Sequence, residues 1–248
     1  MTKTGVADYG MYVWYGDLYD YAKRLEDLKS IGYNGLERLR PISESDAIHK
    51  AGLVRKLGMD FGTCLASTVE HSIQWTSALG KDYVWIDSPA TNFDTFCRHA
   101  NAQAEVCARW GIRAALHNHL GSLVETQEEL LEFLRRCPDC QLVLDTAHLA
   151  VAKGGDPLYI IQNHLDRIVS VHVKDWIMTD SNAAVWNEMG YFCELGGGNF
   201  PVQNEECVRE LISRGYNGWI YVEHDTHLRD PLVDLKGSRD MLRKWSIA

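Results

Sequence analysis

RIVSVHVKD, residues 167–175, is the stretch that decides the fold, because its polar and apolar side chains alternate. Successive side chains on a β-strand point to opposite faces. One face of this segment carries Ile168, Ser170, His172 and Lys174, and the other carries Val169, Val171 and Val173. An apolar run with polar groups on one face, near its carboxyl end, predicts a buried strand that contributes to a site.

Three further apolar runs end in the same way: IRAALH at 112–117, QLVLD at 141–145 and GWIYVEHD at 218–225. The same alternation places Ala115 with His117, Val143 with Asp145, and Trp219 and Tyr221 with Glu223. Together with His172, two imidazoles and two carboxylates therefore point inward at the ends of four strands, where they could hold a divalent ion. The alternative is that these side chains only bond one another, but burying two carboxylates without a cation would be costly.

Short apolar runs alternate with helical stretches along the whole chain, which is the pattern of a parallel sheet. Strands are predicted near 8–14, 34–39, 59–65, 82–87, 112–117, 141–145, 167–174 and 218–223. Helices are predicted at 17–30, 44–57, 69–79, 92–109, 126–136, 156–164, 202–214 and 231–245. Eight strand–helix units predict one α/β domain over residues 1–248, a single (β/α)8 TIM barrel, with its site at the carboxyl ends of the strands.

An internal repeat and one long loop add detail to this barrel. LKSIGYNG at 28–35 parallels LISRGYNG at 211–218, and in both the glycine is predicted to end a helix. The longest loop, about 175–200, follows the seventh strand and contains Trp176 and Trp186. We interpret it as a candidate lid, although its aromatic residues could instead form a contact within a homo-oligomer.

Composition narrows the class of partner. A formal net charge of −9 makes nucleic acid and an anionic membrane surface poor partners. No signal peptide or apolar stretch approaching ~18 residues is present, so no membrane span is expected. Seven scattered cysteines favour a reducing, cytoplasmic location. Cys137 and Cys140 follow a helical stretch and lack a second CxxC, so we interpret them as reduced turn cysteines.

Five motifs carry a family resemblance: HNHLG at 117–121, LDTAHLA at 144–150, DRIVSVHVKDW at 166–176, ELGGGNFP at 194–201 and GYNGWIYVEHD at 215–225. They resemble the xylose-isomerase-like barrels of the sugar-phosphate isomerase/epimerase superfamily. Within it they are most similar to the inosose (2-keto-myo-inositol) dehydratase branch. The motifs run in family order from about residue 112 to the end, whereas the first half fits only in its strand–helix rhythm.

The resemblance implies one divalent ion, usually manganese, cobalt or magnesium, held at four strand ends. Asp145, His172 and Glu223 match three of the family's ligands, whereas His117 stands where the family has a glutamate, which leaves the fourth ligand open. A second imidazole makes the site less suited to Mg²⁺ and favours Mn²⁺, our first choice, or Co²⁺, Fe²⁺ or Zn²⁺.

Three further residues are candidates for proton transfer. His148 lies in the family's DTxH motif, where the residue contacts substrate and can move a proton; the alternative is a histidine that stabilises its turn. Lys174 could bind a substrate oxygen or donate a proton, or it could form a salt bridge with Asp175 or Glu223. His119 shares its face with His117 and could reach substrate or lie in the core. Substrate contacts are predicted for Glu37, where relatives place an acid, and for Trp14, which could form an apolar wall for a sugar ring or lie in the core.

These residues lead to an enzyme hypothesis with a keto-polyol or keto-sugar as substrate. The cation would polarise a ketone and stabilise an enediolate after His148 or His119 takes the α-proton, and Lys174 or water would protonate a departing oxygen. Dehydration of an inosose-like ketone is the first choice. The alternatives are a sugar epimerase or isomerase, a β-eliminating cleavage of a 3-keto-glycoside, and a polyol-binding barrel with a degenerate metal site. A DNA-repair endonuclease on this fold would need several metals and a basic face, and neither the number of candidate ligands nor the net charge of −9 supplies them.

Overall fold

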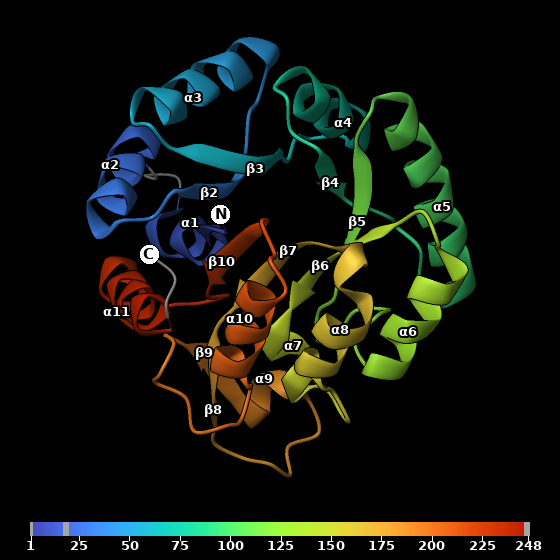
Figure 1. Cartoon of the computed structure of the whole chain (residues 1–248), viewed down its shortest axis with the longest axis vertical. Helices are drawn as coiled ribbons and strands as arrows, with labels where there is room; N and C mark the ends of the chain where they lie inside the picture. The colour runs from blue at the N-terminus through green and yellow to red at the C-terminus, as the bar shows by residue number, and fades with distance from the viewer. Residues whose placement is uncertain (1, 17–19, 246–248) are drawn as a thin grey trace.

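Eight parallel strands form a nearly closed barrel in the computed structural model, which describes residues 2–16 and 20–245 (Figure 1). The strands are β1 Lys3–Ala7, β2 Gly35–Leu39, β3 Asp60–Cys64, β4 Tyr83–Trp85, β5 Arg113–His117, β6 Gln141–Asp145, β7 Ile168–Val173 and β10 Trp219–Glu223. Their order is β3-β2-β1-β10-β7-β6-β5-β4, so the first strand pairs with the last. Within the described chain, no ladder joins β3 to β4, which leaves one seam in the ring.

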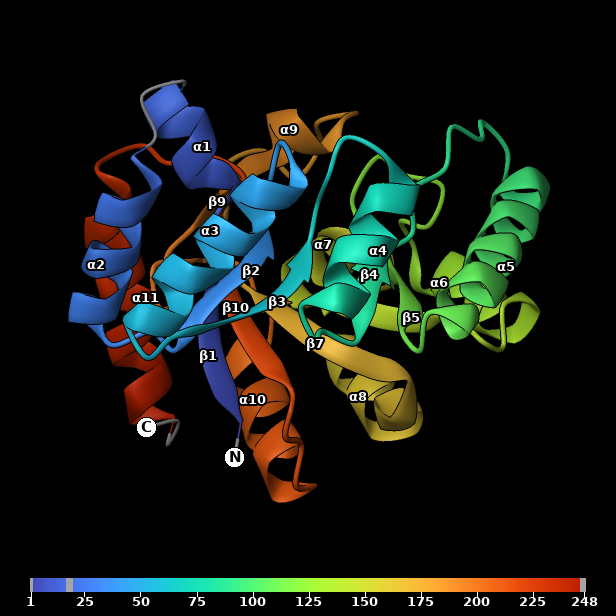
Figure 2. The same cartoon turned by 90° about the horizontal axis from the view of Figure 1, so that it is seen from above.

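Helices surround the strands, as Figure 1 shows. The outer helices are α2 Tyr21–Ile31, α3 Glu44–Lys56, α4 Val69–Ala78, α5 Phe93–Arg109, α6 Gln127–Arg136, α8 Pro157–His164, α10 Asn204–Ser213 and α11 Pro231–Lys244. Short elements follow the carboxyl ends of three strands: α1 Tyr9–Tyr15, α7 Thr146–Val151, and a hairpin of β8 Asp175–Met178 and β9 Gly190–Cys193 with α9 Trp186–Met189 in its loop. In the view of Figure 2, α1 and α9 lie at the same end of the barrel. The predicted single barrel is therefore confirmed in its fold.

Most strands place their side chains as the alternation predicts, with one exception at the start of β7. Leu142, Leu144, Ile220 and Val222 face the helices, whereas Ala115 and Val143 pack inside the barrel. We expected Ile168 inside and Val169 outside, and the structure shows the reverse. The cause is a register shift, because Leu142 pairs with Ile168 but Val143 pairs with Ser170. Val169 is left over as a bulge, and the alternation resumes before His172.

The first strand was predicted in the wrong place. Asp8 is the N-cap of α1 and residues 9–14 lie within that helix, and the strand is β1, which pairs with β10 from Lys3↔Trp219 to Ala7↔Glu223. The run DYGMYVW misled because five of its seven residues are apolar or aromatic, although only Gly10 and Met11 are buried within α1. The predicted helix 17–30 begins among residues outside the described part and is observed as α2.

Two glycines end helices at the positions that the sequence repeat predicted. Gly32 follows α2 with φ +102° and Gly215 follows α10 with φ +72°, so both use the left-handed backbone that ends a helix. Gly62 on β3 serves a different purpose. A Cβ added there would overlap the hydroxyl oxygen of Tyr221 and lie 2.8 Å from that of Tyr83, so the barrel interior closes only around a glycine.

The long loop after β7 is ordered around its own small core. Trp176 is completely buried and packs edge-on against Phe192, with a centroid distance of 4.7 Å. Trp176 therefore is not available for a contact between subunits, whereas Trp186 is partly exposed. All seven cysteines are free, including Cys137 and Cys140. Among residues 2–16 and 20–245, no helix is both long and apolar enough to cross a membrane.

Candidate active site

The four predicted ligands meet at the carboxyl ends of β5, β6, β7 and β10. One ligand atom from each of His117, Asp145, His172 and Glu223 lies within 4.8 Å of the others. His172 Nδ1 is 2.9 Å from Glu223 Oε2 and 3.7 Å from Asp145 Oδ2, and His117 Nε2 is 3.5 Å from Asp145 Oδ2. We call these residues the primary cluster. The His117 and Glu223 side chains are 9% and 4% exposed, and those of Asp145 and His172 are fully buried.

Local structure fixes the two acids of the cluster from behind. Asp145 is the N-cap of α7, and its Oδ1 accepts a hydrogen bond from His148 N at 2.8 Å, so Oδ2 is the oxygen that faces the cluster. The side-chain amide of Asn118 bonds both Asp145 N and Asp145 O, at 2.9 and 3.0 Å. Arg38 Nη2 lies 3.3 Å from Glu223 Oε1, which leaves Oε2 to face the histidines.

Lys174 lies inside the cluster. Its Nζ donates to Asp145 Oδ2 at 2.7 Å and to Glu223 Oε2 at 2.9 Å, and the side chain is fully buried. Of the roles that the sequence left open, the structure shows the pairing with an acid, to Glu223 and also to Asp145. Because the ammonium bonds the two oxygens that would ligate a metal ion, it shares their lone pairs with any bound cation.

Glu37 lies beneath His172, at the end of the barrel interior. The carboxylate is fully buried, and its Oε1 is 3.0 Å from His172 Nε2 and accepts from Trp85 Nε1 at 3.1 Å. A carboxylate behind a ligating imidazole fixes the ring orientation in metal sites. Contact with substrate stays a prediction for Glu37, and the geometry adds a contact with the candidate ligand His172.

These contacts determine the pKa values of the acids and imidazoles in the cluster. Burial would raise the pKa of Asp145 and of Glu223, but Lys174 holds both well below their usual values. Burial would lower the pKa of His172, but Glu37 and Glu223 raise it to about 10. Burial lowers the pKa of His117, and Asp145 offsets this only in part. At pH 7 His117 is therefore neutral and presents a lone pair.

The main chain of Leu120 determines which ring nitrogen carries the proton in the other two histidines, His119 and His148. His119 Nδ1 lies 2.6 Å from Leu120 O, and because a carbonyl only accepts, His119 carries its proton on Nδ1 and leaves Nε2 free. Leu120 N donates to His148 Nδ1 at 3.4 Å, so neutral His148 carries its proton on Nε2. The two rings lie 3.7 Å apart between centroids. They are thus fixed in opposite tautomers, one an acceptor and one a donor.

Asp225 completes this group, and sequence reasoning missed it. Its Oδ2 is 3.4 Å from His148 Nε2 and 3.9 Å from Lys174 Nζ, and its Oδ1 is 3.9 Å from His119 Nε2. The signal was present, because Asp225 lies two residues beyond Glu223, as His119 lies beyond His117 and Lys174 beyond His172. Burial and Lys174 lower the pKa of His148 to about 4, which keeps it neutral.

The tryptophan that lies against the cluster is Trp85, which the sequence did not single out. Its ring stacks on His117 at 4.4 Å, and the Arg38 guanidinium lies 4.4 Å from its centroid. Two cavities, of about 400 and 250 Å³, open on its sides; the first is lined by His117 and the second by Arg38. Trp14 lies instead on α1 and is 45% exposed, so its role as a wall stays a prediction.

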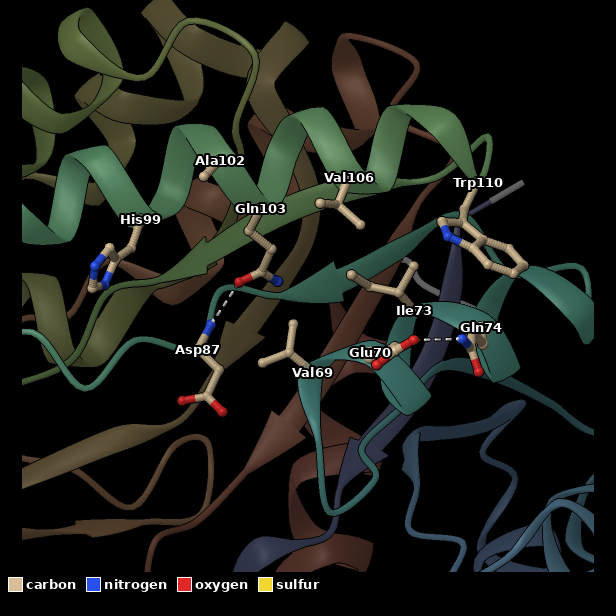
Figure 3. A pocket seen from close by; sticks show the side chains of 10 residues that line it. All are labelled: Val69, Glu70, Ile73, Gln74, Asp87, His99, Ala102, Gln103, Val106 and Trp110. Atoms are coloured by element: carbon tan, nitrogen blue, oxygen red, sulfur yellow. Dashed lines mark hydrogen bonds between the residues drawn. The ribbon is translucent and has the colours of Figure 1, made fainter.

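A third cavity, of about 460 Å³, lies between α4 and α5 (Figure 3). Its lining is mainly apolar, and Val69, Ile73 and Val106 point into it in the close view. None of the primary cluster residues lines it. Volume alone therefore does not select the site, and the polar groups at the strand ends do.

A sequence profile described as xylose isomerase-like TIM barrel matches residues 25–245, nearly the whole chain. The chain belongs to this family. The superfamily that the five motifs indicated is thereby confirmed, and inosose dehydratases are among the curated relatives of this barrel.

Relatives of this xylose isomerase-like barrel differ in how much of the chain they match. The inosose dehydratase of Lactiplantibacillus plantarum is 31% identical over 140 residues, which cover 53% of this chain and 46% of that protein. The chain thus spans about half the length of this curated relative. The structure of the probable 3-DHS dehydratase AsbF from Bacillus anthracis matches with a TM-score of 0.75, 15% identity and coverage of 98% and 99%. L-ribulose 3-epimerase matches at 0.74, with 14% identity and coverage of 99% and 94%.

The residues present in this barrel fit a divalent ion. His117 Nε2 is buried and makes no hydrogen bond within the described residues, and it lies 3.5 Å from Asp145 Oδ2. Two imidazole nitrogens and two carboxylate oxygens are a common donor set for first-row divalent metals. Four carboxylates in this group, Glu37, Asp145, Glu223 and Asp225, face two permanent cations, Arg38 and Lys174. In the metal-free protein, protonated His172 balances a third carboxylate. Once His172 gives up that proton to bind as a neutral imidazole, the two excess negative charges are those that one divalent ion would balance.

Proposed function

We propose that this protein is a divalent-metal-dependent enzyme that dehydrates an inosose-like keto-polyol. The observation that carries the proposal is the pair of histidines, His119 and His148, which Leu120 holds in opposite tautomers beside the primary cluster. Removing an α-proton and a β-oxygen needs one group that accepts a proton and one that donates a hydrogen bond. Both groups lie at one edge of the site, together with Asp225.

His117, Asp145, His172 and Glu223 would hold the metal ion. A divalent ion bound there supplies a Lewis acid for a ketone oxygen. With two imidazoles among the ligands, Mn²⁺ is the first choice, and Co²⁺, Fe²⁺ and Zn²⁺ suit the site better than Mg²⁺. The cavity beside Trp85 and His117 has room for a ring of six carbons with hydroxyl groups.

The free Nε2 of His119 would accept the α-proton, since its other nitrogen is bonded to Leu120 O. The Nε2–H of His148 would donate to an oxygen of the substrate. Lys174, which is protonated and buried, would stabilise negative charge on the substrate or protonate the departing oxygen. Asp225 lies within 4 Å of all three groups and would orient them.

Dehydration is preferred because inosose dehydratases are among the relatives that share sequence with this chain. Epimerisation starts with the same α-proton transfer and is the second candidate. It differs in that the proton returns to carbon and no oxygen leaves. Elimination of an aglycone from a 3-keto-glycoside would use the same groups.

Incubation with Mn²⁺ and 2-keto-myo-inositol tests the proposal. We expect the absorbance of a conjugated enone to increase with wild-type protein and to be absent with Asp145→Asn, which keeps the N-cap of α7. Metal analysis of both proteins is the companion measurement. A new ketose without enone would favour the epimerase, and no metal in either protein would favour a non-catalytic polyol-binding barrel.

The two histidine roles are separated by α-proton exchange in D₂O, measured by NMR. His119→Gln should lose exchange by at least about a hundredfold, because the accepting nitrogen is removed. His148→Gln should retain more exchange than His119→Gln but lose dehydration. Exchange that survives in His119→Gln and disappears in His148→Gln would reverse the assignment.

A further inference from the structure

A second group of metal-binding side chains lies beyond the end of β10. His224 follows the strand, His227 lies in the next loop, and Asp234 lies in the first turn of α11. His224 Nδ1 is 3.3 Å from His227 Nδ1 and 3.9 Å from Asp234 Oδ2, and His227 Nδ1 is 2.9 Å from Asp234 Oδ2. The three side chains are 1%, 2% and 7% exposed. This second cluster shares no residue with the primary cluster.

The distances match those between ligands of one small cation. Zinc binds imidazole nitrogen and carboxylate oxygen at roughly 2.0–2.2 Å in tetrahedral geometry, which places neighbouring ligand atoms on the order of 3.3–3.5 Å apart. The three observed separations, 2.9, 3.3 and 3.9 Å, lie on both sides of that value. A cation at the centre would require shifts of only a few tenths of an ångström.

Hydrogen bonds alone cannot satisfy the three ligand atoms of this cluster at once. A neutral imidazole nitrogen either donates or accepts, and an ionised carboxylate only accepts. If His227 Nδ1 donates to Asp234, it has no lone pair for His224. If His224 Nδ1 donates to His227, the lone pair of Asp234 faces an acceptor. One cation would bind all three atoms at once.

The surroundings hold the second cluster rigidly. Arg229 bonds Asp234 Oδ1 and reaches Glu194 Oε1 at 2.6 Å, so the other oxygen of Asp234 is the one left for a metal ion. Carboxylate ligands in metal sites are commonly fixed in this way by an outer partner. On the opposite side α1 packs closely, since a Cβ added at Gly10 would overlap the carbonyl oxygen of His224 and lie 3.0 Å from the His227 ring.

We propose that His224, His227 and Asp234 bind a second divalent ion, of the zinc class, with water as the remaining ligand. Two imidazoles and one carboxylate suit Zn²⁺ better than Mg²⁺ or Ca²⁺. The ion ties the loop after β10 to α11. That loop carries Asp225, whose Oδ2 lies 3.4 Å from His148 Nε2, so the second ion fixes an acid of the active site without contacting substrate.

Zinc counting in an Asp145→Asn background tests this independently of the primary cluster. Chelator-treated protein is reloaded with Zn²⁺, dialysed and analysed for metal. We expect one ion per chain in Asp145→Asn and none in Asp145→Asn/His227→Asn or Asp145→Asn/Asp234→Asn. Asp145→Asn/His49→Asn is the matched control and should keep one ion, because His49 is exposed on α3.

Cobalt gives a spectroscopic reading of the same site. Asp145→Asn loaded with Co²⁺ should show a visible absorption band with one equivalent of metal, and the double variant Asp145→Asn/His227→Asn should lack it. Circular dichroism in chelator checks that each variant folds, and Asp234→Asn replaces any histidine variant that does not. Zero zinc in Asp145→Asn, or equal zinc with and without His227, would overturn the second site. The primary site fails separately, if wild type and Asp145→Asn bind the same amount.

Discussion

Lys174→Met is expected to destabilise metal-free protein and to strengthen metal binding. The ammonium lies 2.7 Å from Asp145 Oδ2 and 2.9 Å from Glu223 Oε2 in a fully buried position. Methionine fills a similar volume but leaves both carboxylates without this partner. Removing one member of a buried ion pair costs about 3–5 kcal/mol.

The midpoint of thermal unfolding reports this cost. For a chain of this size each kcal/mol shifts the midpoint by about 2–4 °C, so chelator-treated Lys174→Met should unfold about 6–20 °C lower than wild type. Lys236→Met is the matched control, because Lys236 is 67% exposed and pairs with Asp240 on the surface of α11. Loss of that pair should cost only about 0.3–0.5 kcal/mol.

Metal should reverse much of the loss. With Lys174 removed, no ammonium shares the two oxygens and none repels the incoming cation, so Mn²⁺ should bind at least about tenfold more tightly, as measured by calorimetry. The midpoint should therefore rise more with Mn²⁺ in Lys174→Met than in wild type. The reasoning is refuted if the unfolding midpoint of Lys174→Met in chelator equals that of Lys236→Met, or if Mn²⁺ raises it no more than it raises that of wild type. Lys174 would then not balance the negative charge of the two carboxylates.

Three other substitutions have defined outcomes. Gly62→Ala should lower the free energy of unfolding in urea by about 1–3 kcal/mol, because its Cβ would overlap Tyr221. Gly52→Ala in α3, with no described atom within 4 Å, should raise that free energy by about 0.5–1 kcal/mol. Equal effects of the two substitutions would contradict the packing at Gly62. His117→Glu should shift metal preference toward Mg²⁺ by roughly tenfold relative to Zn²⁺ in competition titrations, and an unchanged ratio would exclude His117 as a ligand. Trp186→Ala removes the ring that lies 6.2 Å from His119 and 6.3 Å from His148. It should lower kcat/KM by about tenfold with little change in the unfolding midpoint. Unchanged kinetics would contradict the interpretation of the loop that contains α9 as a lid.

The barrel could be predicted from sequence because its strands and helices differ in period. Seven of the eight barrel strands were placed within two residues of their observed ends, since apolar runs of four to six residues between helices leave little choice of register. The first strand was missed because Lys3–Ala7 is short and partly polar, and the apolar segment after it forms α1. Only pairing with β10, which lies at the other end of the chain, identifies it.

The site was predictable to the extent that it follows strand alternation. Asp145, His172 and Glu223 and their neighbour His117 share one face by parity alone, and they meet in the structure. The tautomers of His119 and His148 could not be predicted, because they depend on how Leu120 turns after β5. Trp85 was missed for a similar reason. β4 is only three residues long, so its alternation gives too little signal.

The seam between β3 and β4 has a consequence for how such a barrel can change. Separating these two strands breaks no ladder between them, whereas widening the ring anywhere else would sacrifice main-chain hydrogen bonds. The cavity of about 250 Å³ beside Trp85 lies at this junction, and Thr63 and Ile86 line it from the two sides. Larger or smaller side chains at these positions could therefore alter the size of molecule admitted while the remaining circumference stays intact, which makes the junction a natural starting point for redesigning selectivity.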